Sequence, residues 1–141
     1  MSFLVPFIPE HLDNLDAKVG DAAEAATFPD VADTLSRIGA QTLLTDDRRI
    51  VLGILGVVPS VPGVCEVFII ASKDQARHPL AFARCVHREI GKLCSKYRRI
   101  EAKTADDEFH KRWITWLGFE REGTLKRYGL HGENMVLWSL T

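Results

Sequence analysis

The sequence predicts an α/β fold: a mixed, mostly antiparallel sheet flanked by helices.

 

Three observations predict this architecture: short apolar runs typical of strands, amphipathic segments of helical period between them, and the order in which the two alternate. That order is β-α-α-β-β-β-α-β-α-β-β, and no Pro/Ser-rich linker or internal repeat interrupts it. We therefore expect one domain spanning residues 1–141.

The first third of the chain predicts an edge strand followed by two helices. The strand covers residues 3–8, and Pro6 places it at a sheet edge or at a bulge, because proline cannot donate a ladder hydrogen bond. One helix opens at Pro9, and a second follows Pro29 and ends at Gly39. The residues expected to face inward are Leu12, Leu15, Val19, Val31, Leu35 and Ile38.

Strands dominate the middle of the sequence. Residues 41–45 and 49–58 flank a turn of two aspartates and predict a hairpin. Gly53 and Gly56 inside the second strand indicate a bulge or a close approach of another segment. Residues 64–71 form an almost continuous apolar run, which is typical of a central strand buried on both faces.

The second half predicts two helices and a final hairpin. The longer helix covers residues 79–97, with an apolar stripe from Phe82 to Tyr97, and a short strand follows at 99–103. Thr104 is expected to cap the next helix, which ends at Gly118. Its expected inward residues are Phe109, Trp113 and Leu117. Residues 119–128 and 135–140 then pair through a turn at 129–132.

Composition excludes several classes of protein. Hydrophobic residues make up 46% and charged residues 26% of the chain, its net charge is -1, and no apolar run reaches the length of about 18 residues that a membrane helix needs. We expect neither a membrane nor a nucleic-acid partner, since nucleic-acid-binding domains are usually basic. Cys65, Cys85 and Cys94 lack metal-ligand spacing and are expected to be reduced, buried thiols. With no secretory signal, these features favour a cytoplasmic protein without a metal.

The net charge conceals an asymmetry between the two halves. Residues 1–72 carry 4 basic and 10 acidic side chains, whereas residues 73–141 carry 14 basic and 9 acidic ones. The second half is therefore suited to hold an anion and the first to face a cation. Two solvated faces would give the same count, so charge alone leaves both interpretations open.

One segment, together with the order of the elements, resembles a known protein family. Residues 112–123 read Arg-Trp-Ile-Thr-Trp-Leu-Gly-Phe-Glu-Arg-Glu-Gly. The segment resembles the junction of helix and last hairpin in the GNAT superfamily of N-acetyltransferases, and the element order resembles that family over essentially the whole chain. Residues 78–84 and the Trp-rich last helix are also similar to acetyltransferase-like proteins of tailed bacteriophages. The resemblance implies transfer of an acetyl group from acetyl-CoA to an amine.

The resemblance also implies where acetyl-CoA would bind. The family holds the diphosphate on backbone N–H groups at the start of the long helix, where unpaired amides and the helix dipole favour an anion. In the family's Gly-rich loop pattern, Gln75 keeps the first position, while His78 and Leu80 replace glycines and Pro79 removes a donor. The implied contacts to the cofactor are Phe68, Ile70, Ala71, Ser72, Gln75, Ala76, Arg77, His78, Leu80, Arg84 and Asp107. A vestigial site that no longer binds CoA remains the alternative.

Two residues are candidates for proton transfer. Glu66 is the only acid in its apolar strand, where burial would raise its pKa toward that of a useful base. A position at the wet end of the strand, or a pair with an arginine, would explain Glu66 equally well. The family's usual leaving-group acid is a tyrosine whose position is taken here by Ile114, so Tyr128 on the last hairpin is the substitute. Asp107 is also explained by helix capping.

Two classes of function follow. The first is an N-acetyltransferase acting on a small amine, a protein lysine or an N-terminus, including one of a host protein in the host cytoplasm if a phage encodes the chain. The second is a non-catalytic binding protein of the same fold, such as a virion component or a host-directed effector, with a degenerate cofactor loop. The acidic residues of the early helices would favour a cationic acceptor, or they only solvate those helices. Monomer and homodimer both remain open.

Overall fold

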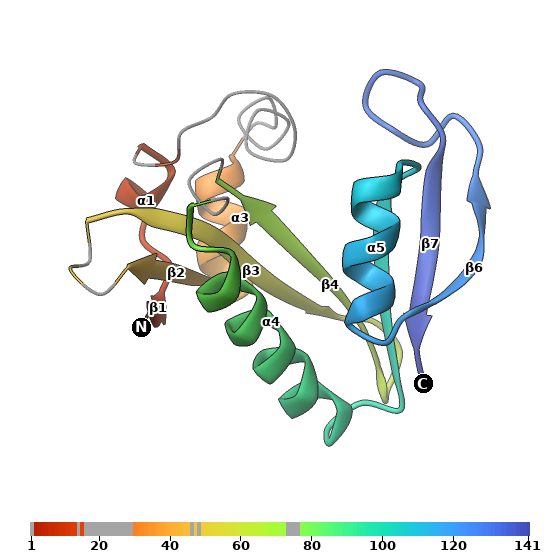
Figure 1. Ribbon diagram of the computed structural model, residues 1–141, viewed down its shortest axis with the longest axis horizontal. Coiled ribbons are helices and arrows are strands. Elements are labelled where there is room, and N and C mark those ends of the chain that lie inside the picture. Colours follow the sequence, from red (N-terminus) through yellow and green to blue (C-terminus); the bar gives the residue numbers. More distant parts are fainter. Residues whose placement is uncertain (1, 14, 16–29, 46, 48, 73–76) are drawn as a thin grey trace. The chain divides into compact units, whose positions relative to one another are not determined.

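The computed structural model describes residues 2–13, 15, 30–45, 47, 49–72 and 77–141 (Figure 1). Within these residues, the helices and strands follow the predicted order, β-α-α-β-β-β-α-β-α-β-β. The strands form one seven-stranded sheet in the order β1-β2-β3-β4-β5-β7-β6. The chain forms two compact units, Met1–Val57 with Phe68–Val86, and Val58–Val67 with His87–Thr141. Each strand pair described below lies within one unit.

The first unit begins with an antiparallel meander. Strand β1 (Ser2–Pro6) pairs with β2 (Gln41–Thr45), and β2 pairs with β3 (Val51–Pro59). Because β1 is the outermost strand, the edge position predicted from Pro6 is confirmed. The helices between β1 and β2 are α1 (Glu10–Asp13) and α3 (Val31–Arg37), and the expected stripe residue Val19 lies outside the described residues.

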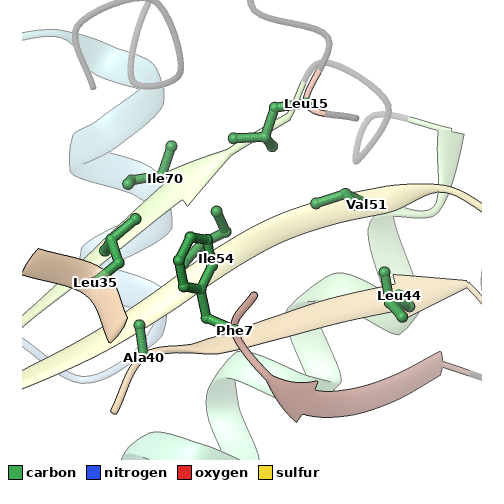
Figure 2. Packing of buried hydrophobic residues seen from close by; sticks show 8 residues of the cluster. All are labelled: Phe7, Leu15, Leu35, Ala40, Leu44, Val51, Ile54 and Ile70. Atoms are coloured by element: carbon green, nitrogen blue, oxygen red, sulfur yellow. The ribbon is translucent and has the colours of Figure 1, made fainter. Parts of the chain in front are cut away.

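Buried side chains from these helices and strands form the core of the first unit (Figure 2). They are Phe7, Leu15, Leu35, Ala40, Leu44, Val51, Ile54 and Ile70. Leu35 lies on α3 as the helical period predicts, and the chain leaves that helix through Gly39 at a φ of 69°. In this core, Val51 and Ile54 of β3 pack with Ile70 in the second half of strand β4 (Val64–Ala71).

The two glycines of β3 allow other side chains to approach the strand closely. A Cβ placed on Gly56 would overlap the ring of Phe68, and one placed on Gly53 would lie 3.1 Å from the ring of Phe82. Phe82 belongs to helix α4 (Pro79–Cys94), whose buried residues Phe82, Val86 and Ile90 confirm the first part of the predicted apolar stripe. The close approach predicted from the glycines is therefore confirmed. The helix ends at Cys94 and not at Tyr97 as predicted, so Tyr97 lies beyond it.

The second unit contains the first half of β4 and the last three strands. Strand β5 (Arg99–Ala105) is parallel to β4 and antiparallel to β7 (Met135–Leu140), which pairs in turn with β6 (Glu120–Leu125). Helix α5 (Glu108–Trp116) connects β5 to β6 and ends at Gly118, whose φ is 100°. No helix in the described parts of the chain has the length and apolar character needed to cross a membrane.

Several sequence-based expectations for the second unit are wrong. The residue that caps α5 is Asp107 rather than Thr104, because β5 continues to Ala105 and Thr104 accepts a hydrogen bond from the Trp138 indole. The residues that face inward also differ from those expected. Phe109 is 65% exposed, whereas Ile114 is buried, as is Leu117.

Two further expectations are corrected by burial and strand length. Cys94 is exposed at the end of α4, whereas Cys65 and Cys85 are buried as expected. Strand β6 ends at Leu125, so Tyr128 lies in the loop between β6 and β7 rather than in a strand.

Candidate active site

The pairing of β4 with β5 stops soon after it begins. It covers Val64↔Arg99, Cys65↔Ile100 and Glu66↔Glu101, although β4 continues to Ala71. Backbone groups of a strand alternate between its two neighbours, so the end of this ladder leaves β4 amides without a β5 partner within the described register. Unpaired strand amides are donors that a ligand carbonyl can use.

A hydrogen bond to β3 shows which β4 amides these are. The N–H of Ser72 donates to the carbonyl of Leu52 on β3 at 3.0 Å. By alternation, the N–H groups of Ile69 and Ala71 point away from β3. The resemblance implied a cofactor contact at Ala71 but not at Ile69. The sequence alone does not show which way an amide points, since that direction depends on the strand register.

The side chains of Phe68, Ile70 and Ser72, which the resemblance implied as contacts to the cofactor, pack within the protein. Ile70 is part of the core in Figure 2, and Phe68 packs against the same core from a half-buried position. Ser72 is fully buried. A ligand at this segment would therefore meet backbone more than side chains.

The start of α4 presents cations and few amides. Pro79 is the first helical residue and has no N–H, and the N–H of Phe82 already donates to the carbonyl of His78 at 3.0 Å. The amides of Leu80 and Ala81 are the other donors of this first turn, and among the described residues neither has a hydrogen-bond partner outside the helix. Arg77 is exposed and Leu80 is 68% exposed, while Gln75 and Ala76 lie outside the described residues.

Arg84 differs from the basic residues that follow it on α4. Arg88 and Lys92 both form ion pairs with Glu89, at 3.5 and 2.9 Å. Arg84 is exposed, and within the described parts of the chain it forms no ion pair. The positive charge of Arg84 is therefore not neutralised by a neighbouring carboxylate of that helix.

Glu66 forms an ion pair with a lysine on the adjacent strand. The Nζ of Lys103 on β5 donates to both carboxylate oxygens of Glu66, at 3.0 and 3.2 Å. The two side chains are 28% and 37% exposed, so neither is deeply buried. An ion pair was one of the alternatives for Glu66, but the cation is Lys103 and not an arginine.

Tyr128 contacts the same lysine. Lys103 Nζ lies over the ring of Tyr128, 5.2 Å from its centroid. Burial lowers the pKa of Lys103, but hydrogen bonds to Tyr128 and Glu66 outweigh burial and raise it. The structure thus gathers both predicted catalytic residues around one ammonium group. Sequence reasoning missed Lys103, since only the parallel register shows that it shares a face with Glu66.

Asp107 is occupied by its own helix. Its carboxylate accepts from the N–H of His110 at 2.8 Å and contacts the His110 ring nitrogen Nδ1 at 2.8 Å. Burial acts to raise the pKa of Asp107, and the hydrogen bonds from His110 lower it by more. The capping role expected for Asp107 is confirmed, and contact with a cofactor stays a prediction.

Glu122, which lies in the segment that resembles the GNAT junction, joins three strands through hydrogen bonds. Arg99 donates two hydrogen bonds to the carboxylate of Glu122, at 2.6 and 2.8 Å, and a third to Glu101 at 2.8 Å. The hydroxyl of Ser139 also donates to Glu122. These bonds connect β5, β7 and β6, and they lower the pKa of Glu122 to about 2. Ile114, at the position of the family's tyrosine, is buried.

The acidic residues of the early segment are only partly described. Glu10 and Asp13 belong to α1, Asp30 precedes α3, and Asp33 pairs with Arg37 at 3.2 Å. Asp16, Asp21 and Glu24 lie outside the described residues. Attraction of a cationic acceptor by this segment therefore stays a prediction.

Comparison with solved structures decides which fold this is. A GNAT-family acetyltransferase from Bacillus anthracis superposes with a TM-score of 0.73 at 13% identity, covering 99% of this chain and 93% of that one. A chimera of the spermidine N-acetyltransferase SpeG from Vibrio cholerae and hSSAT gives 0.76 at 12% identity, covering 99% and 94%. The chain has the GNAT acetyltransferase fold. The ribosomal-protein-S5-alanine acetyltransferase of Vibrio fischeri shares that fold with a TM-score of 0.68 at 16% identity, covering 99% and 92%. No family model and no curated protein sequence matches the chain.

Proposed function

We propose that this protein is an N-acetyltransferase that uses acetyl-CoA and acetylates an amine. The observation that carries the proposal is the β4–β5 pairing, which stops at Glu66↔Glu101 and leaves the amides of Ile69 and Ala71 directed away from β3. These amides are suited to hold the thioester carbonyl of an acyl-CoA, because aligned N–H groups stabilise the negative charge that develops on that oxygen. The GNAT fold supports the same proposal.

The diphosphate of acetyl-CoA is assigned to the start of α4. Leu80 and Ala81 supply backbone donors there, and Arg77 and Arg84 supply positive charge. Since His78, Pro79 and Leu80 replace the flexible, donor-rich loop typical of the family, the arginines would contribute a larger share of the binding free energy than backbone amides do.

Glu66 and Tyr128 are assigned the proton transfers. Glu66 accepts a proton from the acceptor ammonium, directly or through water, and the neutral nitrogen attacks the acetyl carbon. A C–N bond forms, the C–S bond breaks, and the phenol of Tyr128 protonates the departing thiolate. The nitrogen, which carries one extra proton after the attack, returns that proton through water to the Tyr128 phenolate, so the products are a neutral amide and the CoA thiol. The acceptor is an amine, with spermidine and a lysine-containing peptide as the first compounds to test.

A charge-reversal experiment tests the diphosphate placement. Arg77→Glu/Arg84→Glu should weaken acetyl-CoA binding by about 10²-fold, because two charge-assisted contacts of about 1.5 kcal/mol each are lost. The remaining affinity should depend less on salt than that of the wild type. Binding is measured by calorimetry at two salt concentrations.

The matched control reverses the charge of two lysines, Lys92 in the last turn of α4 and Lys96 just beyond its end. Lys92→Glu/Lys96→Glu makes the same change in net charge, yet it should leave acetyl-CoA affinity within about twofold after screening by salt. Equal affinity of the Arg77/Arg84 variant and the wild type would contradict the placement. Equal losses in both double variants would show that net charge, and not a local site, attracts the ligand.

The competing function is a non-catalytic binding protein of the same fold. The presence of Pro79 at the first position of α4 favours it, since the proline removes one donor from the anion site. This second function predicts no acetyl-CoA binding and no turnover of any amine. The titration above therefore separates the two functions.

A further inference from the structure

One ammonium group connects the two residues assigned to proton transfer. Lys103 Nζ is 3.0 and 3.2 Å from the two carboxylate oxygens of Glu66, and 5.2 Å from the centroid of the Tyr128 ring. Glu66 comes from β4, Lys103 from β5 and Tyr128 from the β6–β7 loop, so three separate segments meet at this nitrogen.

The strand register places Lys103 on the face it needs. Glu66 pairs with Glu101 in the parallel ladder, and Lys103 follows Glu101 by two residues, so all three share one face of the sheet. The opposite face carries the buried residues Ile100 and Ala102. On the shared face, β7 presents Leu137 beside Lys103, which brings no competing charge.

The charged groups nearest this pair along β5 bind one another. Arg99 donates hydrogen bonds of 2.6 to 2.8 Å to Glu101 and Glu122. Lys103 is therefore the cation that Glu66 contacts among the described residues, and Glu101 has its own partner.

The Tyr128 side of the contact is also held in place. The N–H of Arg127 donates to the side chain of Asn134 at 3.0 Å, and the N–H of Gly129 donates to the carbonyl of Glu133 at 2.9 Å. The backbone on each side of Tyr128 is thus tied across the loop, and the Lys103 ammonium lies against the ring that this loop presents.

We propose that Lys103 is a positioning residue, whose ammonium holds the Glu66 carboxylate and the Tyr128 ring in the arrangement that proton transfer requires. The inference rests on the proposed acetyltransferase function. Hydrogen bonds to Tyr128 and Glu66 raise the pKa of Lys103 despite its partial burial, so its side chain is an ammonium near neutral pH. It therefore acts on Glu66 by charge and does not itself accept the proton.

The test compares Lys103→Met, which removes the charge and keeps the length, with Lys103→Arg, which keeps the charge. Acetyl transfer from acetyl-CoA to spermidine and to a lysine-containing peptide is followed as a function of amine concentration. Lys103→Met should lower kcat by about 10²-fold, the cost of misplacing a reacting group, and leave acetyl-CoA affinity unchanged. The loss should appear in kcat and not in KM for the amine, because a misplaced proton acceptor slows the transfer step without removing a contact to the amine. Lys103→Arg should restore kcat, because it returns a cation to the same place.

Lys111→Met is the matched control, since Lys111 is another partly exposed lysine of the second unit that forms ion pairs, with Asp106 at 3.5 Å and Glu108 at 3.7 Å. It should leave kcat unchanged. If the wild type turns over amines and Lys103→Met keeps the wild-type kcat, the positioning inference is wrong and the proposed function stands. If the wild type binds acetyl-CoA but acetylates neither amine, the proposed catalytic function and the inference fall together.

Discussion

The contact between Gly56 and Phe68 allows a stability prediction worked from the structure. A Cβ at Gly56 would overlap three atoms of the Phe68 ring, so Gly56→Ala must displace either that ring or β3. Phe68 is half-buried against the core of the first unit. Full burial of a phenylalanine contributes about 1.5–3 kcal/mol, and forcing an extra methyl group into a packed core costs about 1–3 kcal/mol. We expect Gly56→Ala to lower the free energy of unfolding by about 1–3 kcal/mol.

A double-mutant cycle identifies the cause of that loss. In a Phe68→Ala background the ring is absent, so Gly56→Ala should cost less than about 0.5 kcal/mol and give a coupling energy of about 1–3 kcal/mol. Gly123→Ala is the matched control, because Gly123 also lies in a strand and a Cβ there would have open space. It should be neutral or stabilising by up to about 1 kcal/mol.

Urea unfolding followed by far-UV circular dichroism gives these free energies, provided that each variant unfolds in a single cooperative transition. The reasoning fails if Gly56→Ala costs the same with and without the Phe68 ring. It also fails if Gly56→Ala is no more destabilising than Gly123→Ala.

Two further predictions concern catalysis and pH. Glu66→Gln should lower kcat by about 10²–10⁴ while calorimetry shows unchanged acetyl-CoA affinity, and full activity would exclude Glu66 as the base. Burial lowers the pKa of His11, with an opposing contribution from Glu10, and its Nδ1 accepts from the N–H of Ile8 and contacts the Thr42 hydroxyl at 2.7 Å. Because the unfolded chain binds the proton more readily, stability should fall as pH drops below about 6.5, and urea midpoints of His11→Asn should show a smaller fall between pH 7 and 5. Equal falls in the two proteins would contradict this assignment.

The sequence predicted the elements whose signals are local. Strand β4 (Val64–Ala71) matches its predicted bounds because a continuous apolar run sets both ends, and β7 (Met135–Leu140) matches for a similar reason. Gly39 and Gly118 follow their helices at positive φ, as their positions after an apolar stripe indicate. In contrast, Thr104 and Asp107 both offer capping side chains, and only the length of β5 decides between them.

The candidate site was less accessible to sequence reasoning because its contacts are long-range. Glu66 and Tyr128 were singled out by their residue types, but their shared partner Lys103 is 37 residues from Glu66 in the chain and carries no motif. Ile69 was missed because the direction of its N–H depends on the register between β4 and β3. The sequence can suggest the chemistry of a residue, whereas pairing of strands decides what that residue contacts.

Calorimetric titration of the wild-type protein with acetyl-CoA tests the central claim most directly. The account predicts saturable binding of one acetyl-CoA per chain, with a Kd between about 1 µM and 1 mM, as is typical of enzyme substrates. The affinity should weaken as salt is added, because Arg77 and Arg84 supply charge to the diphosphate site. Absence of binding at millimolar acetyl-CoA would contradict the account and favour a non-catalytic protein of the same fold.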